Sequence, residues 1–234
     1  MAVYACSDLH GNGILWDKIK NYLRPADTLV FLGDAADRGK DGYRIIKEML
    51  AEPQIVYLKG NHEDLMVNAA KEKFMGYSGS DCILWTYYNG GSSTMKDWVA
   101  DGMPKDIINK LQNLPFLKVY HNNLNQTIYL LHAGCKYENL QILEEEDALW
   151  NRNHFYADWD GPDNVFIIHG HTIGDYLHED VSAVRPASFF DITYPIIKYC
   201  DGHKFDIDCG TIVSNRTVLL NLDTWNIIEF KVGD

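Results

Sequence analysis

Five short apolar runs recur along the chain, and each is followed at once by a cluster of polar residues and glycine. The runs occupy residues 3–6, 29–32, 55–58, 128–131 and 165–168. Continuous runs of β-branched and aromatic residues are typical of strands buried on both faces of a sheet. Because parallel strands end at one edge of a sheet, where open α/β proteins bind ligands, we expect the five polar clusters to converge there.

Helical apolar spacing separates the first three runs. Residues 14–23 and 43–49 have this spacing, so the first 65 residues read as alternating strands and helices, one βαβ unit after another. Residues 66 to about 115 are predicted to be mainly helical, with breaks at 76–79 and 89–91 and a stop at Leu114-Pro115. This helical segment is expected to interrupt the sheet.

The second half of the chain is less regular. A short acidic helix is predicted from Glu144 onwards, and residues 173–200 read as a loop-rich excursion that could cover the site. Strands are predicted at 205–207, 218–221 and 225–230, and the last two form a hairpin around Asp223-Thr224.

These elements together predict an α/β (α+β) fold, in which a central β-sandwich of mixed sheets is flanked by helices. The chain has 234 residues, of which 46% are hydrophobic, and this is enough for a substantial core. We therefore expect residues 1–234 to form a single domain.

Composition limits the partners and the compartment. A formal charge of -12, from 33 acidic and 21 basic side chains, disfavours sequence-independent binding to nucleic acid or anionic lipid. The chain contains no 18-residue apolar stretch and starts directly with a strand. Its five cysteines have neither zinc-site spacing nor the density of a disulfide framework. We expect a cytoplasmic protein without a nucleic-acid or membrane partner; its oligomeric state is left open.

The polar clusters carry metal-ligand chemistry. They read SDLHG at 7–11, GDAADRG at 33–39, GNHE at 60–63, HAG at 132–134 and HGHT at 169–172. Asp8 and His10 are two residues apart, so a continuing strand would point both to one side, where they could bind one metal. Asp34 follows a flexible glycine, and its two oxygens could bridge two cations about 3.5–4 Å apart.

A mixed set of oxygen and nitrogen ligands completes the site. Asn61 offers a neutral oxygen, while His132 and His171 offer imidazoles, and this set suits manganese, iron or zinc better than calcium. Taken alone, a lone Asp-x-His pair is more often a turn, and a lone histidine is more often a buried structural residue. The metal hypothesis therefore depends on all the clusters occurring together.

In this order, the five clusters resemble the motifs of the phosphoprotein phosphatase family of calcineurin-like metallophosphoesterases. In particular they resemble the small bacterial and phage-lambda type. The family motifs GDxHG, GDxxDRG, GNHE and HAG and a later histidine are matched over nearly the whole chain. Two positions depart from the pattern, since Ser7 replaces the first glycine and Cys209 stands where threonine is usual. Trp85, with the glycines that follow it, also looks like that subgroup.

The resemblance implies a role for each residue of the clusters. One metal would be held by Asp8, His10 and Asp34, and the other by Asp34, Asn61, His132 and His171. The catalytic residues would be His62, Asp37 and Arg38, together with Arg152 of the LWNR run at 149–152, which also looks like that subgroup. A metal-bridging hydroxide would attack phosphorus directly, His62, oriented by Asp37, would protonate the leaving alkoxide, and both arginines would bind the phosphoryl oxygens. Two divalent metal ions are the implied cofactors, with manganese favoured.

The resemblance favours a serine/threonine protein phosphatase acting on phosphoproteins or phosphopeptides. One alternative is a symmetrical dinucleoside tetraphosphate hydrolase, because that family shares the metal motifs. Another is a non-catalytic scaffold of the same fold, which is disfavoured because all the site positions are intact. Outside the proposed site, His169 and Asp208 are interpreted as supporting residues, whereas His154 and His203 have no spacing that distinguishes them from surface residues.

Overall fold

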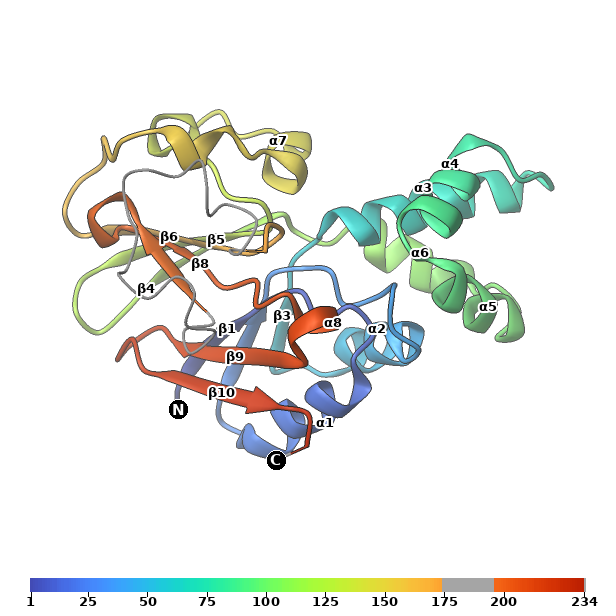
Figure 1. Cartoon of the computed structure of the whole chain (residues 1–234), viewed down its shortest axis with the longest axis horizontal. Coiled ribbons are helices and arrows are strands. Elements are labelled where there is room, and N and C mark those ends of the chain that lie inside the picture. Colours follow the sequence, from blue (N-terminus) through green and yellow to red (C-terminus); the bar gives the residue numbers. More distant parts are fainter. Residues whose placement is uncertain (174–195, 234) are drawn as a thin grey trace.

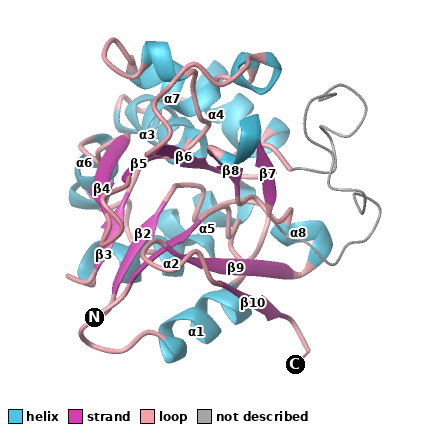
Figure 2. Cartoon of the chain, turned by 90° about the vertical axis from the view of Figure 1, so that its left-hand side faces the viewer, coloured by secondary structure: helices cyan, strands magenta, loops and turns pink. Residues whose placement is uncertain are grey.

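Two five-stranded β-sheets pack face to face, with helices on their outer sides (Figure 1). The computed structural model describes residues 1–173 and 196–233. Figure 2 shows one sheet lying above the other when the molecule is turned by 90°. This confirms the predicted fold class, a sandwich of mixed sheets flanked by helices.

The first sheet is built from both ends of the chain, in the order β10-β9-β1-β2-β3. Its strands are β1 (Val3–Cys6), β2 (Thr28–Phe31), β3 (Ile55–Tyr57), β9 (Arg216–Asn221) and β10 (Ile227–Lys231). The first three are parallel, as predicted, and are connected by α1 (Gly13–Tyr22) and α2 (Gly42–Ala51). The predicted hairpin is confirmed as β9 and β10, which pair antiparallel.

The second sheet has the order β4-β5-β6-β8-β7. Its strands are β4 (Leu117–His121), β5 (Thr127–Leu131), β6 (Val165–His169), β7 (Ile197–Tyr199) and β8 (Lys204–Asp206). The central strands β5, β6 and β8 are parallel, and both edge strands are antiparallel to their neighbours. The prediction of a loop-rich excursion was wrong at its end, because β7 lies there. Residues 174–195, and with them the question of a cover over the site, lie outside the described residues.

A helical segment extends to one side of the sandwich (Figure 1). It contains α3 (Asn61–Phe74), α4 (Ser80–Ile83), a π-helix, η1 (Leu84–Tyr88), α5 (Ser92–Ala100) and α6 (Lys105–Gln112). This confirms the prediction of a mainly helical insertion. Shorter helices are η2 (Tyr137–Asn139), α7 (Glu145–Trp150), η3 (Asn153–Tyr156), η5 (Cys200–Gly202) and α8 (Thr211–Ser214). No helix within the described residues is both long enough and apolar enough to span a bilayer.

The apolar runs are continuous because both faces of the strands are covered. In β1, Tyr4 and Cys6 pack against the helices, while Ala5 packs against the second sheet. Likewise Leu29 and Phe31 of β2 face the helices, and Val30 lies between the sheets. Burial on alternating sides removes both sets of side chains from water, and a fully buried aliphatic side chain contributes about 1.5–3 kcal/mol. The resulting rigid sandwich fixes the strand ends that carry the polar clusters.

Candidate active site

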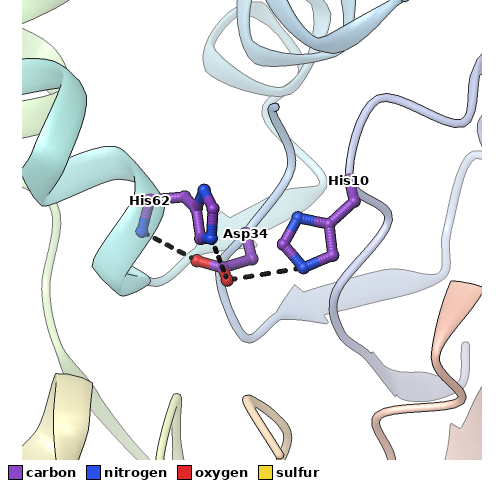
Figure 3. A group of neighbouring side chains, drawn as sticks. All are labelled: His10, Asp34 and His62. Atoms are coloured by element: carbon purple, nitrogen blue, oxygen red, sulfur yellow. Dashed lines mark hydrogen bonds and ion pairs between the residues drawn. The ribbon is translucent and has the colours of Figure 1, made fainter. Parts of the chain in front are cut away.

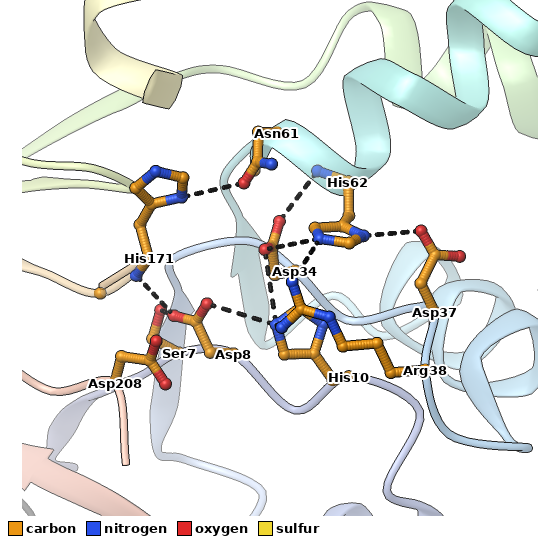
Figure 4. Close-up of polar contacts among 12 residues, drawn as sticks. Ser7, Asp8, His10, Asp34, Asp37, Arg38, Asn61, His62, His171 and Asp208 are labelled. Carbon is orange, nitrogen blue, oxygen red and sulfur yellow. Dashed lines mark hydrogen bonds and ion pairs between the residues drawn. The ribbon is translucent and has the colours of Figure 1, made fainter. Parts of the chain in front are cut away.

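The loops that follow β1 and β2 run side by side beyond the strand ends. The backbone N–H of Asp8 donates to Gly33 O at 3.1 Å, and that of His10 donates to Asp34 O at 3.0 Å. The expectation that Asp8 and His10 continue a strand was wrong, since β1 ends at Cys6 and both residues have positive φ angles of 53° and 44°. Their side chains nevertheless turn toward the same site (Figure 4).

Asp34 lies at the centre of the site, and its two oxygens face different groups. Oδ2 lies 3.7 Å from His10 Nε2 and 3.8 Å from His62 Nε2 (Figure 3). Oδ1 lies 3.5 Å from His132 Nε2 and accepts the backbone N–H of His62 at 3.0 Å. Although burial alone would raise the pKa of Asp34, the surrounding imidazoles, with His132 foremost, hold it below its usual value. The carboxylate is therefore ionised.

Asn61, His132 and His171 converge on one side of Asp34. His132 Nε2 lies 2.8 Å from Asn61 Oδ1 and 3.1 Å from His171 Nδ1, and the latter is 3.0 Å from the same amide oxygen. His132 donates its Nδ1 proton to Leu32 O at 2.8 Å. Donation from Nδ1 leaves Nε2 as the ring atom that faces the other two side chains.

Asp8 and His10 lie on the other side. Asp8 Oδ2 accepts hydrogen bonds from the Ser7 hydroxyl and from the backbone N–H of His171, while Oδ1 lies 3.7 Å from His10 Nε2. His10 Nδ1 faces Ala36 O at 3.2 Å. Burial lowers the pKa of His10 to about 3, so its Nε2 carries a lone pair.

This donor set fits a pair of metal ions. Two groups, His10 with Asp34 and His62, and Asp34 with His132 and His171, each bring their ligand atoms within 4.8 Å of one another. Asp8 Oδ1 and His171 Nε2 are buried without a hydrogen-bond partner in the described part of the chain. Crowded lone pairs and an ionised carboxylate are costly in a buried site unless a cation balances them. The mixed oxygen and nitrogen chemistry matches transition metals.

His62 is held by Asp37, which is itself held by the helical segment. His62 Nδ1 donates to Asp37 Oδ2 at 2.7 Å, and the Trp85 indole N–H donates to the same oxygen at 2.7 Å. Thr94 accepts the backbone N–H of Asp37 at 3.1 Å. Burial would lower the pKa of His62, but the charges of Asp34 and Asp37 raise it above its usual value. These charges therefore favour the protonated form of His62.

The two arginines are placed differently. Arg38 lies within the site, with Nη1 2.8 Å from His10 Nε2 and Nη2 3.0 Å from His62 Nε2. Both contacts require a lone pair on the imidazole, so Arg38 cannot keep them when a metal binds His10 or a proton binds His62. Arg152 lies between α7 and η3 and donates from Nε at 3.1 Å to Oγ1 of Thr172, the residue after His171.

Sequence reasoning missed several supporting residues. Glu63 is fully buried and accepts the backbone N–H groups of Asp34, Ala35 and Gly60, which fixes the turn that carries Asp34. The interpretation of His154 as an ordinary surface histidine was wrong, because the structure buries it completely. Its position two residues after Arg152 was the only signal in the sequence.

Residues 1–207 match the calcineurin-like phosphoesterase family. The chain belongs to this family. It is therefore a hydrolase of phosphoesters, in a family that uses divalent metal ions.

Curated relatives are protein phosphatases. Serine/threonine-protein phosphatase with EF-hands 2 from Homo sapiens is 42% identical over 152 residues, which cover 61% of this chain and 18% of that protein. The protein of the same name from Mus musculus is 40% identical over 74 residues, covering 28% of this chain and 10% of that protein. The chain thus matches only a small part of these relatives' length.

Solved structures agree with the fold. A protein described as a diadenosine tetraphosphatase has a TM-score of 0.65 at 16% identity, over 99% of this chain and 94% of that one. A serine/threonine phosphatase from Saccharomyces cerevisiae, similar to human PP5, has a TM-score of 0.55 at 12% identity, over 100% and 81%. A cold-active protein-tyrosine phosphatase of Shewanella sp. has a TM-score of 0.53 at 15% identity, over 97% and 76%. At these identities the likeness shows the fold alone.

Proposed function

We propose that the chain is a metal-dependent serine/threonine protein phosphatase. The observation that carries the proposal is the position of Asp34, whose two oxygens face two separate groups of ligand atoms while its neighbour in space, His62, pairs with Asp37. The 42% identity to a protein phosphatase supports a phosphoprotein substrate.

Six residues would hold two divalent cations, manganese being favoured. Asp8, His10 and Asp34 would hold one, and Asp34, Asn61, His132 and His171 the other. The ligand atoms of His62 also lie close to those of His10 and Asp34, but its Nδ1 donates to Asp37 and its raised pKa suits a proton donor. Bound cations supply positive charge that lowers the pKa of water and neutralises phosphoryl oxygens.

The protein's own side chains bind the substrate and move the proton. Arg38 and Arg152 would bind the phosphoryl oxygens through their planar guanidinium groups. His62 Nε2 would give its proton to the departing serine or threonine oxygen, and Asp37 would keep the ring oriented through Nδ1. Substrate binding draws Arg38 away from His62 Nε2, which leaves that atom free to carry the proton.

A substrate panel tests the proposal. Manganese-loaded enzyme is incubated in parallel with a phosphoserine peptide, a phosphotyrosine peptide and diadenosine tetraphosphate. We expect kcat/KM for the phosphoserine peptide to exceed that for diadenosine tetraphosphate at least tenfold, about 1.4 kcal/mol in transition-state binding. The reverse order would assign the chain to the dinucleotide hydrolases.

The acid role of His62 is tested with two leaving groups. His62→Asn should slow hydrolysis of the phosphoserine peptide by about 10²–10⁴, since an alkoxide leaves poorly without a proton. Hydrolysis of p-nitrophenyl phosphate should fall less, because its phenolate is a good leaving group. Metal content is measured on the same samples. Equal losses for both substrates with two metals bound would rule out the acid role.

A further inference from the structure

Three buried polar side chains form a hydrogen-bonded chain beside the site. They are His154 on η3, His169 at the end of β6 and Tyr199 on β7, and none is more than 1% exposed. Tyr199 Oη lies 2.6 Å from His169 Nε2 and 2.9 Å from His154 Nδ1. His154 Nε2 lies 2.7 Å from Ala133 O, and His169 Nδ1 lies 3.1 Å from Gly170 O. The proposed reaction uses none of the three.

Both ends of this hydrogen-bonded chain have a fixed direction. Ala133 O and Gly170 O can only accept, so each contact there needs the proton of the facing ring nitrogen, His154 Nε2 or His169 Nδ1. The Tyr199 hydroxyl lies within hydrogen-bond distance of the other nitrogen of each ring and has one proton to donate. It therefore links the two imidazoles.

The hydrogen-bonded chain of His154, Tyr199 and His169 connects the two loops that carry His132 and His171. Ala133 directly follows His132, and His169 lies two residues before His171. The same loops are joined by the backbone N–H of Gly170, which donates to His132 O at 2.8 Å.

Close packing leaves the hydrogen-bonded chain no room to shift. A Cβ at Gly134 would lie 2.7 Å from His154 Cε1, and the Tyr199 ring stacks on Phe155 with centroids 5.2 Å apart. Moving any one of the three polar side chains would therefore move a loop that holds an imidazole of the site.

We propose that the Tyr199 hydroxyl is a positioning group that sets the spacing of His132 and His171 for metal binding. This inference rests on the proposed function, because it assigns a support to that site. A transition metal accepts imidazole nitrogens at about 2.0–2.1 Å, so a small shift of either loop weakens binding. Loss of such supporting hydrogen bonds typically costs about 10–100-fold in metal affinity or activity.

Tyr199→Phe tests the proposal, because it removes the hydroxyl and keeps the stacked ring. The thermal unfolding of the full chain is followed while manganese is added to protein freed of metal by a chelator. We expect the manganese concentration that gives the half-maximal shift to rise about tenfold. At saturating manganese, kcat/KM should return to near the wild-type value, since the catalytic groups are intact.

A matched control variant and a second substitution within the hydrogen-bonded chain complete the test. Tyr43→Phe removes the hydroxyl of a buried tyrosine on α2, which donates at 2.7 Å to Asp101 at the end of α5 and takes no part in the hydrogen-bonded chain. This variant should leave the manganese requirement unchanged. His154→Phe interrupts the same chain at its Ala133 end and should raise that requirement. The positioning role is overturned if the wild type responds to manganese and Tyr199→Phe and His154→Phe have the same manganese requirement as the wild type. It is also overturned if Tyr43→Phe raises that requirement equally. A wild type without any response would instead overturn the proposed metal site.

Discussion

At the scale of single residues, the site is built from backbone conformations that residues other than glycine rarely adopt. Positive φ angles between 44° and 72° occur at six of its residues. These are Asp8, His10, Asp34, Asp37, Arg38 and His171. Each such residue costs of order 1–3 kcal/mol, and the cost persists only where the surrounding structure imposes it. The paired loops and the buried carboxylate of Glu63 impose it here, and the side chains consequently point to one centre.

Thr172 should matter for catalysis through Arg152. Its hydroxyl accepts from Arg152 Nε, and Thr172→Val removes the acceptor while keeping the shape of the side chain. We expect kcat/KM for a phosphoserine peptide to fall about fivefold, about 1 kcal/mol, the net value of one hydrogen bond. Thr172→Ser keeps the hydroxyl and should retain activity. Similar rates for the two variants would show that the hydrogen bond to Thr172 is not needed to position Arg152.

The sequence indicated which side chains the structure brings together better than it indicated the residues that hold them in place. His132 directly follows an apolar run and Asp34 follows one after a single glycine, so the ends of the strands bring them together. Tyr199 and Thr172 could not be found in this way. Tyr199 lies on a short edge strand, and the partners of its hydroxyl, His154 and His169, are distant in sequence. Thr172 is one hydroxyl among many. Such contacts depend on how the two sheets pack, which no local pattern encodes.

At the scale of elements, prediction worked where both faces of a strand are buried. Strands β1, β2, β5 and β6 have continuous apolar runs because they lie inside the sandwich. Strand β4 was missed because most of its side chains are not buried, and Lys118 and Val119 are exposed. Strand β7 was missed because it has three residues, at an edge. Edge strands of this kind lack the pattern by which buried strands are identified.

The start of α3 depends on Glu63, which accepts from three backbone N–H groups and from the Tyr57 hydroxyl. Glu63→Gln brings an amide NH₂ against these donors, so we expect urea unfolding to show a loss of about 1–3 kcal/mol. The turn that carries Asp34 should loosen as well, and phosphatase activity should fall.

Glu72→Gln provides the matched control for this prediction. Glu72 also accepts three backbone N–H groups, those of Gly79, Asp81 and Cys82, but it caps α4 away from the site. This variant should lose comparable stability while the activity of the folded protein remains. Equal activity losses in the two variants would mean that Glu63 acts only through general stability.

At the scale of the whole molecule, the sandwich gathers negative charge and lone pairs at one edge. The chain carries a formal charge of -12, and within the described residues Asp8, Asp34, Asp206 and Asp208 are buried near one another or near the site imidazoles. Burial raises the pKa of Asp206 and Asp208 well above the usual value, and neighbouring carboxylates add to the effect. Cations bound at this edge would relieve that repulsion, so the fold and the metal site should be coupled.

Metal binding should therefore stabilise the whole chain. A ligand that binds only the native state at 100 times its Kd contributes about 2.7 kcal/mol, or roughly 5–10 °C in Tm for a chain of this size. We expect added manganese to raise Tm by this amount and a chelator to reverse the rise. Asp34→Asn keeps the shape of the side chain but lowers its charge, and should lose most of the shift because Asp34 faces both groups of ligand atoms. Asp147→Asn, which changes the net charge equally on the exposed face of α7, should keep the full shift. If Asp34→Asn keeps it too, manganese stabilises the protein without the central carboxylate, and Asp34 does not bridge two ions.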